Sequence, residues 1–528
     1  MNRRYFWHLP ELKRFRAVFE DRETILGADA AGQHRFFRKD TGKICFDERQ
    51  AARLCIAALI KDETAEHLSE KKSAEPRSKR ITIIGSGASG TLLTVNLLRS
   101  AADQPLEINL IEKKKKIGRG LAYSTGSDCH LLNVPAENMG AFEEDPEHFY
   151  RWLIENEYDY KPKDFVPRRI YGSYLRDVLA NAIAEKSSSV KINLIEDEAI
   201  DVKTGEDCAQ VILKSGEILF SDRVVLAFGN FAPSDPPVEN PSFTGAEKYF
   251  RNPWSEKIYE KIEPADDVLI IGTGLSMVDV VLSFHQRGHR GKIFAVSTHG
   301  LLPAVHRLGR DLPPFNGEIT SQFKISGMMK TVREKIREQE AAGGDWRAVI
   351  DALRPVTQKA WLNIDETEKR RFVRHLGRIW NVSRHRMPAE CAAVLDEMRV
   401  ARRLHLKKGR VRAINLTEDG KLEVIFFQNG LKNKISVDAV INCTGSQTNF
   451  SKIDIPLVKN LLAGGLLTPD ALNLGVKALP DGRVLNKFGG VSDKLFVIGS
   501  ALKGVLWEST AIPEIRIQAG KTAAALLA

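Results

Sequence analysis

Long apolar runs are missing from this chain of 528 residues. A helix that spans a membrane needs about 20 apolar residues in succession, whereas the apolar runs here, such as Val268–Ile271, have the length of a strand. The first ten residues include Arg3 and Arg4 but no apolar segment of the kind that a signal peptide requires. We therefore expect a cytoplasmic protein with no membrane partner.

Clustered cysteines are missing as well. The six cysteines are scattered through the chain, and none forms a Cys-x-x-Cys pair or a group with histidine. This spacing argues against a disulfide scaffold, a zinc ribbon and a dithiol redox pair, so we expect no metal site.

Positive charge is present but unevenly distributed. The net charge is +10, and residues 369–410 alone contain 13 basic and 3 acidic residues, so the rest of the chain is nearly neutral. Such a segment forms a solvated helical face, lines a cleft for a phosphate-rich cofactor or an anionic substrate, or binds nucleic acid. Nucleic acid is the least expected partner, because interleaved stacking aromatics and a nucleic-acid motif are lacking.

The sequence changes texture along its length. Residues 1–60 predict a small α+β extension, with a strand at Arg35–Lys39 and a helix at Phe46–Ile60, and residues 61–80 hold almost no large apolar side chain and predict a polar linker. From Ile81 onwards, short β-branched runs alternate with helix-periodic segments, which is typical of a parallel sheet built from βαβ units. Charged, helix-periodic segments such as Met328–Glu340 and Glu366–Ile379 then predict a helical region. Strands return at Leu422–Phe427 and Val437–Cys443.

A buried strand, Ile81–Ile84, runs directly into the glycine pattern G-x-G-x-x-G at residues 85–90. In this pattern the first glycine allows a tight turn, the second admits a pyrophosphate, and the third lets the following helix pack closely. A second strand ends at Glu112, 22 residues after Gly90, where a carboxylate can bind ribose hydroxyls. The strand, the turn, the helix and the acid together predict a dinucleotide site.

A second fingerprint begins 187 residues later, at Gly272-Thr-Gly-Leu-Ser-Met277. Met277 replaces the third glycine, and the next strand ends at Ser297-Thr298-His299, where no acid is present. An acid there would repel a 2′-phosphate, so its absence favours NADP over NAD, although no arginine stands at this point to bind the phosphate. The alternative is a degenerate half-site that binds nothing.

Two fingerprints in one chain are explained most economically by one flavin nucleotide and one nicotinamide nucleotide. The cofactors expected are therefore FAD and NADPH or NADH, with hydride transfer from the second to the first. The fold class predicted is α/β, with two Rossmann-like dinucleotide-binding domains of the three-layer ββα type, a helical insertion and the N-terminal extension. The predicted division is 1–60 and 61–80, an FAD-binding domain at 81–265 and 408–528, an NAD(P)-binding half-domain at 266–300, and a helical insertion or lid at 301–407.

Several further segments occur in a fixed order. They are Gly118–Tyr123, His130–Met139, Asp145–Trp152, Pro167–Arg168, Tyr171–Tyr174, Gly272–Asp279, Gly300–Pro303, Ser383–Pro388 and Trp507–Arg516. Together with the two fingerprints they resemble the bacterial FAD/NAD(P)-binding flavoproteins, which are distantly similar to N-hydroxylating and Baeyer–Villiger flavin monooxygenases. The resemblance covers about residues 80–528.

The resemblance implies which residues hold the cofactors. For FAD these are Gly85, Ser86, Gly87, Ala88, Ser89, Gly90, Glu112, Lys113, Arg119, Asn133, Val134, Gly229, Gly499 and Ser500. For NAD(P) they are Gly272, Thr273, Gly274, Leu275, Ser276, Ser297 and Gly445. Gly229 and Gly445 each follow a strand and resemble the crossings between the two domains. A helix expected to begin near Pro513 would stabilise negative charge on the reduced flavin.

Six residues are candidates for catalysis: His130, Asn133, Arg384, His385, Trp507 and Glu508. Each also has a structural interpretation that stays open. His130 and Asn133 contact the flavin or are ordinary loop residues, and Arg384 and His385 bind an anionic group or form a surface cluster. Trp507 and Glu508 meet the substrate or only pack before the last helix.

The function expected is that of an FAD-dependent oxidoreductase reduced by NAD(P)H. A monooxygenase that uses molecular oxygen on a small anionic or amine-bearing substrate is the leading interpretation, and the helical insertion would then close the pocket against water. An NAD(P)H:acceptor reductase and a non-catalytic flavin-binding interaction protein are the alternatives. No motif specifies the oligomeric state.

Overall fold

The computed structural model describes residues 78–113, 117–239, 241–307, 312–315 and 317–528, and three strands before them. Those strands, β1 (Arg16–Glu20), β2 (Thr24–Ala28) and β3 (His34–Arg38), pair antiparallel in the order β1-β2-β3. The strand expected near Arg35 is confirmed as β3, whereas the helix expected at 46–60 lies outside the described residues. The chain divides into two compact parts, residues 1–77 and 78–528.

The first Rossmann sheet has the strand order β19-β20-β10-β4-β5-β6. Its strands are β4 (Lys79–Ile84), β5 (Leu106–Ile111), β6 (Val190–Ile195), β10 (Arg223–Leu226), β19 (Arg483–Leu485) and β20 (Val491–Val497). Neighbouring strands run parallel except for the pair β19 and β20. The apolar runs of β4, β5 and β10 are buried on both faces, as a parallel sheet covered on both sides requires.

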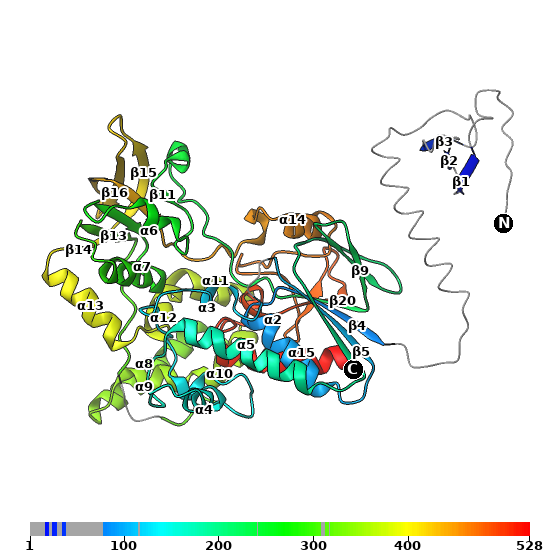
Figure 1. Ribbon diagram of the computed structural model, residues 1–528. Coiled ribbons are helices and arrows are strands. Elements are labelled where there is room, and N and C mark those ends of the chain that lie inside the picture. The colour runs from blue at the N-terminus through cyan, green and yellow to red at the C-terminus, as the bar shows by residue number, and fades with distance from the viewer. Residues whose placement is uncertain are drawn as a thin grey trace. The chain divides into compact units, whose positions relative to one another are not determined.

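Different layers cover the two faces of this sheet. One face packs against α2 (Ala88–Ser100), α5 (Arg168–Glu185) and α15 (Ile512–Leu527), which lie side by side along β4 and β5 in Figure 1. The other face packs against the antiparallel strands β7 (Ala199–Thr204), β8 (Ala209–Leu213) and β9 (Ile218–Ser221) and against α14 (Pro456–Ala463). This is the three-layer ββα arrangement that the sequence predicts.

The second Rossmann sheet has the order β11-β18-β12-β13-β14, with all strands parallel. Its strands are β11 (Tyr249–Phe250), β12 (Val268–Ile271), β13 (Ile293–Ser297), β14 (Leu404–Lys408) and β18 (Ala439–Asn442). The helices α7 (Leu275–Gln286) and α13 (Ala389–Val400) cover one face. The antiparallel sheet of β15 (Arg410–Leu416), β16 (Leu422–Gln428) and β17 (Leu431–Val437) covers the other.

We call each sheet with the layers that cover it a Rossmann unit, or first and second unit for short. The second unit is larger than the half-domain expected at residues 266–300. Its sheet draws strands from 249 to 442, so the boundary expected at residue 408 falls inside it. The strand expected at 437–443 is also divided, because Val437 ends β17 and β18 begins at Ala439. Sequence spacing missed this because parallel pairing joins segments that are far apart in the chain.

The helical insertion consists of α8 (Ile325–Ala341), α9 (Trp346–Ala352), α10 (Arg354–Asn363), α11 (Glu366–His375) and α12 (Gly377–Arg384). The single helix expected over 366–379 is divided into α11 and α12 at Leu376. Trp361 and Ile364 of the insertion share an apolar core with Trp507 of the first unit. The insertion is thus packed against the C-terminal part of the chain.

Short elements complete the fold: α3 (Gly120–Tyr123), α4 (His148–Glu155) and α6 (Lys257–Lys261). Of the helices described, none has the length and apolar composition that crossing a membrane requires.

Candidate functional site

The first glycine turn is built for close backbone approach. Gly85, at the end of β4, has φ +105°, and a Cβ there would lie 2.4 Å from the carbonyl oxygen of Ala227. A Cβ on Gly90 would lie 1.9 Å from the carbonyl oxygen of Gly85. Gly87 is the N-cap of α2, whose first turn begins with Ala88 and Ser89 and contains no acidic residue. The N-terminus of α2 therefore carries no negative side chain of its own, which suits a phosphate.

Glu112 lies beside this turn, immediately after β5. Its Oε2 accepts hydrogen bonds from the backbone N–H of Ser86 at 3.1 Å and from the Ser86 hydroxyl at 3.0 Å. Both bonds use one oxygen, and the second oxygen suits a ribose hydroxyl. Lys113, the next residue, is exposed.

Three segments that the resemblance implied separately meet at this edge of the sheet. The Ser500 hydroxyl donates a hydrogen bond to the carbonyl of Gly229, and a Cβ on Gly499 would lie 2.5 Å from Ser89 Oγ. The backbone N–H of Gly499 donates to Gln518 Oε1 at 3.1 Å, which joins the segment to α15. The segments around residues 85, 229 and 499 thus form one site.

Buried polar atoms without hydrogen-bond partners mark the same region. Among the described residues they include Arg119 Nε, Trp507 Nε1, Ser509 Oγ, Arg516 Nε and Gln518 Nε2. Four of these residues belong to the segment 507–518, and Arg119 lies in the loop after Glu112, which is held to the turn by the bond from Gly118 N–H to the Ser86 carbonyl. An unpaired buried polar atom costs about 1–3 kcal/mol, so a polar ligand is expected to satisfy them. The residues present fit FAD.

The second glycine turn repeats the construction of the first. Gly272 has φ +114°, and a Cβ there would lie 2.3 Å from the carbonyl oxygen of Cys443. Gly274 is the N-cap of α7, which begins with Leu275 and Ser276. Gly445, beyond β18, has φ +98°. Both Gly445 and Gly229 of the first unit have open space where a Cβ would lie. The turn is intact and fits a second dinucleotide.

The end of β13 carries a hydroxyl network in place of an acid. Thr273 Oγ1 lies 2.8 Å from Ser297 Oγ and donates to the carbonyl of Leu301 at 2.6 Å. Parallel pairing places Lys408 of β14 opposite Ser297, and a Cβ on Gly300 would lie 3.2 Å from Lys408 Cβ. Lys408 is exposed and thus places a positive charge beside the end of β13. Sequence reasoning missed Lys408 because its strand follows the whole helical insertion.

His130 lies between the two Rossmann units. Its Nδ1 lies 2.7 Å from Thr125 Oγ1 and its Nε2 lies 2.8 Å from Ser283 Oγ of α7. Burial lowers the pKa of His130, and nearby Arg168 lowers it further, so the ring is neutral near pH 7. Because both nitrogens are engaged, this geometry favours a positioning role over contact with substrate.

A buried ion pair joins the units at the same place. Arg168, at the start of α5, donates to both carboxylate oxygens of Asp279 in α7 at 2.8 and 3.0 Å, and its Nε donates to the carbonyl of Leu131. Both side chains are largely buried. The two motifs that contain these residues were noted only as parts of the resemblance, and the pairing was not predicted.

Asn133 and the buried Val134 belong to the loop expected to face the flavin. The Asn133 carbonyl lies 3.1 Å from Nε2 of His306, whose ring packs against Phe165 with ring centres 4.7 Å apart. Burial lowers the pKa of His306 to about 4. His306 is a polar residue of this region that sequence reasoning missed, since no motif surrounds it.

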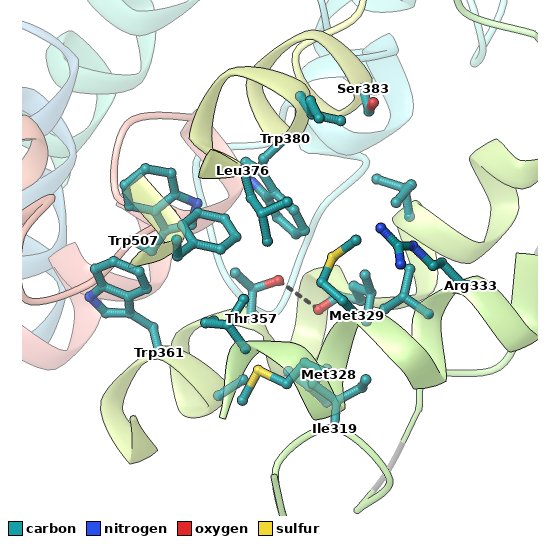
Figure 2. Close-up of a pocket in the computed structure, with 18 of the residues that line it drawn as sticks. Ile319, Met328, Met329, Arg333, Thr357, Trp361, Leu376, Trp380, Ser383 and Trp507 are labelled. Carbon is teal, nitrogen blue, oxygen red and sulfur yellow. Dashed lines mark hydrogen bonds between the residues drawn. The ribbon is translucent and has the colours of Figure 1, made fainter. Parts of the chain in front are cut away.

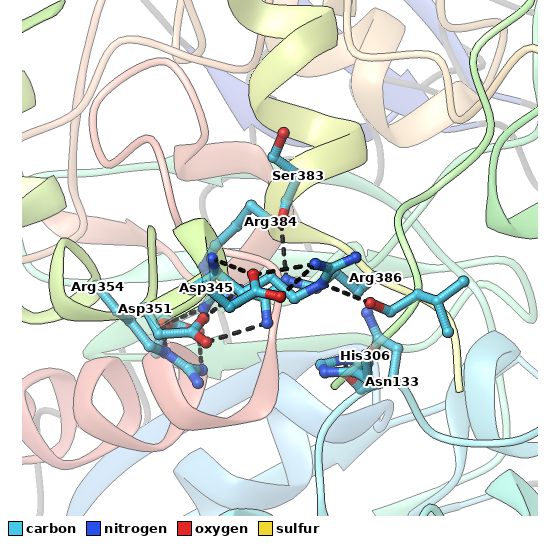
Figure 3. Close-up of polar contacts among 11 residues, drawn as sticks. Asn133, His306, Asp345, Asp351, Arg354, Ser383, Arg384 and Arg386 are labelled. Carbon is cyan, nitrogen blue, oxygen red and sulfur yellow. Dashed lines mark hydrogen bonds and ion pairs between the residues drawn. The ribbon is translucent and has the colours of Figure 1, made fainter. Parts of the chain in front are cut away.

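Arg384 lies inside the protein, and the neighbouring His385 is partly buried. Arg384 is 9% exposed and faces Glu514, which forms a two-bond ion pair with Arg354 at 2.7 and 3.1 Å (Figure 3). Burial lowers the pKa of His385, whose Nε2 lies 3.9 Å from Glu508 Oε1. The structural alternative of an exposed helix end is therefore wrong for Arg384.

Glu508 is 4% exposed, and its Oε1 accepts a hydrogen bond from Trp380 Nε1 at 2.7 Å. Four of the six catalytic candidates, Arg384, His385, Trp507 and Glu508, thus gather where the insertion meets the C-terminal segment. His130 is held elsewhere, against α7. No group of residues suited to hold a metal ion occurs in the described part of the chain.

Comparison with known proteins agrees with this geometry. Residues 82–231 match a family model described as FAD-NAD(P)-binding. An uncharacterised protein of Escherichia coli K12 is 26% identical over 222 residues, and the match spans 39% of this chain and 39% of that relative.

Solved flavoenzymes share the fold. The ornithine N-hydroxylase of Kutzneria sp. 744 has a TM-score of 0.57 at 15% identity, covering 85% of this chain and 99% of its own. The L-lysine 6-monooxygenase of Pseudomonas syringae has a TM-score of 0.56 at 17% identity, with coverage of 85% and 99%. The FAD-bound cadaverine monooxygenase of Erwinia amylovora has a TM-score of 0.54 at 12% identity, with coverage of 86% and 95%. The chain therefore has the fold of N-hydroxylating flavin monooxygenases, as the resemblance implied.

Proposed function

We propose that this protein is an FAD-dependent oxidoreductase in which NADPH reduces the flavin, and that it acts as a monooxygenase on a small organic substrate. One observation carries the proposal: two intact glycine turns, each with φ above +100° at its first glycine, lie in one chain and are joined by the Arg168–Asp279 pair. A protein that only bound flavin would have no use for the second turn.

The first unit holds FAD in this proposal. The N-terminus of α2 binds the pyrophosphate, and Glu112 accepts hydrogen bonds from the ribose. The unpaired donors of Trp507, Ser509 and Arg516 face the polar edge of the ring system. Bound FAD would supply a two-electron acceptor that reacts with molecular oxygen once it is reduced.

The second unit holds the nicotinamide nucleotide. The N-terminus of α7 binds its pyrophosphate, and Ser297 leaves room for a 2′-phosphate that an acid would repel. Lys408 supplies the positive charge that this phosphate needs. We therefore propose NADPH as the preferred donor over NADH.

The helical insertion favours oxygen insertion over simple electron transfer to an external acceptor. Trp361 Nε1 donates to the carbonyl of Gly504 and Gln358 Nε2 donates to the carbonyl of Glu508, so the insertion is tied directly to the segment that follows β20. Packing of this kind excludes water from the reacting centre, as a monooxygenase requires.

The test is the stoichiometry of NADPH consumption in air. We expect slow NADPH oxidation with hydrogen peroxide release in the absence of substrate. The amines named for the structural neighbours, ornithine, lysine and cadaverine, are the first substrates to screen. With a substrate, consumption rises and peroxide accounts for only a small part of it, the remainder being recovered as oxygenated product. If peroxide or an external acceptor accounts for all the NADPH with every substrate, the protein is a reductase.

A further inference from the structure

The helical insertion contains a cavity that the nucleotide sites do not use. It has a volume of about 320 Å³ and lies among α8–α12, with Trp507 of the first unit at one side (Figure 2). Its lining includes Met328, Met329, Trp361, Phe372, Trp380 and Trp507. An apolar cavity of about 150 Å³ binds benzene, so this space suits a ligand with roughly twice as many non-hydrogen atoms, about twelve.

Two indole N–H groups and one hydroxyl of the lining are already paired. Trp361 Nε1 bonds the Gly504 carbonyl and Trp380 Nε1 bonds Glu508, so the indole faces remain for the cavity. The Thr357 hydroxyl donates to the carbonyl of Leu353 at 2.8 Å, as the dashed line in Figure 2 marks. A water molecule inside would find few partners, and an apolar occupant is favoured.

One unpaired cation lines the cavity on the side away from Trp507 (Figure 2). Arg333 of α8 lines the cavity, is exposed, and has no hydrogen bond or ion pair among the residues that the structure describes. Its neighbours on α8 differ, because Lys330 pairs with Glu334 and Lys335 pairs with Glu318 and Glu338. A guanidinium matches a carboxylate in two parallel hydrogen bonds, so an anionic end group fits here.

The side wall of the cavity favours a flexible chain over a rigid ring. Met328, Met329 and Val332 of α8 form one wall, and methionine side chains adapt their shape to an occupant. The opposite end is aromatic and closes at Trp507, which precedes Glu508 of the candidate site. We propose that this cavity binds a medium-chain aliphatic carboxylate of about ten carbons, with its tail at Trp361 and Trp507 and its carboxylate at Arg333. We further propose that this ligand is a substrate of the enzyme. That second step rests on the proposed function, whereas the binding does not.

The test is a binding titration with decanoate, followed by tryptophan fluorescence and by calorimetry. Four tryptophans line the cavity, namely Trp346, Trp361, Trp380 and Trp507, so occupation changes the emission directly. We expect saturable binding of decanoate and none of butyrate at the same concentrations. The measurement needs neither NADPH nor oxygen, so its failure overturns this inference alone, and failure of flavin reduction overturns only the proposed function.

Three variants make the binding test specific. Arg333→Gln is expected to weaken decanoate about tenfold, or about 1.4 kcal/mol, and to leave 1-decanol unchanged. Arg337→Gln is the matched control, since Arg337 is exposed on the same helix but does not line the cavity. Ala360→Phe fills the cavity and is expected to abolish binding of both ligands. Equal effects of the two arginine variants, or undiminished binding in a folded Ala360→Phe protein, would overturn the proposal.

A separate measurement assigns the role of the ligand. If decanoate is a substrate, it raises NADPH consumption in air in the native protein but not in Ala360→Phe. If it binds without changing consumption, the cavity is a binding site outside the reaction, and the substrate assignment is overturned.

Discussion

The two Rossmann units are built around the same kind of glycine turn. In each, the first glycine has φ above +100° and packs against the carbonyl oxygen of the residue that follows a neighbouring strand, Ala227 after β10 and Cys443 after β18. In each, the residue after that glycine bonds a residue at the end of the next parallel strand: Ser86 bonds Glu112, just after β5, and Thr273 bonds Ser297, the last residue of β13. The frame is therefore common, and the difference lies in what the frame presents to a ligand.

Two positions distinguish the units. Gly90 brings α2 against the backbone of the first turn, whereas Met277, at the matching position of α7, is fully buried in the apolar core of the second unit. Glu112 is a carboxylate that binds hydroxyls, whereas Ser297 stands beside Lys408. The first unit is thus suited to a ribose without a 2′-phosphate, and the second to one that carries it.

The largest effect is expected from Gly90→Ala. The added methyl group would lie 1.9 Å from the Gly85 carbonyl oxygen, so α2 must move away from the turn and its N-terminus leaves the pyrophosphate. We expect a protein without flavin colour. The visible spectrum of the purified variant measures this, and Gly126→Ala, which has open space around it, is the matched control. A yellow Gly90→Ala protein would show that the close contact of α2 is not needed.

The next effect concerns the link between the units. Arg168→Met leaves the Asp279 carboxylate buried without its partner, and such losses cost about 3–5 kcal/mol. We expect denaturant unfolding at correspondingly lower concentration. The double variant Arg168→Met/Asp279→Leu removes the unpaired charge and is expected to recover most of the loss. An unchanged stability of the single variant would mean that the pair does not hold the units together.

Gly272→Ala changes the first glycine of the second turn, which corresponds to Gly85 in the first turn. The substitution strains a residue at φ +114° and places a methyl group 2.3 Å from the Cys443 carbonyl oxygen. Strain of this kind costs about 1–3 kcal/mol, so we expect reduction by NADPH to slow about 10- to 100-fold at fixed concentration. FAD content is expected to stay normal. Loss of FAD in this variant would contradict the division of nucleotides between the two units.

The smallest effect is expected from Lys408→Ala. Removal of this charge is expected to raise the KM for NADPH about tenfold, or about 1.4 kcal/mol, and to leave the KM for NADH unchanged. Lys407→Ala is the control, because successive residues of a strand point to opposite faces of the sheet. Equal changes for both nucleotides would show that Lys408 does not bind the 2′-phosphate.

Local patterns predicted much of this fold. Both glycine turns, the three-layer sheets, the hairpin strands around residue 425 and the start of α15 near Pro513 follow from strand runs, glycine spacing and helix periodicity. These signals depend on residues close together in the sequence, which is why the features could be predicted.

Pairing between strands that are far apart in the sequence could not be predicted. Nothing in the sequence shows that β14 joins β13 across the insertion, or that β18 lies between β11 and β12. The extent of the second Rossmann unit and the position of Lys408 beside Ser297 were therefore missed. The same holds for the Arg168–Asp279 pair and for His306, whose surroundings are assembled from three separate segments. The cluster of basic residues could be recognised in the sequence, but the burial of Arg384 against Glu514 could not be predicted.

Anaerobic addition of NADPH to the purified protein, followed by visible absorbance, tests the central claim most directly. The account predicts a yellow protein whose flavin absorbance is bleached by one equivalent of NADPH and more slowly by NADH. A yellow protein that neither nucleotide bleaches, or a colourless one that cannot be reconstituted with FAD, would contradict it.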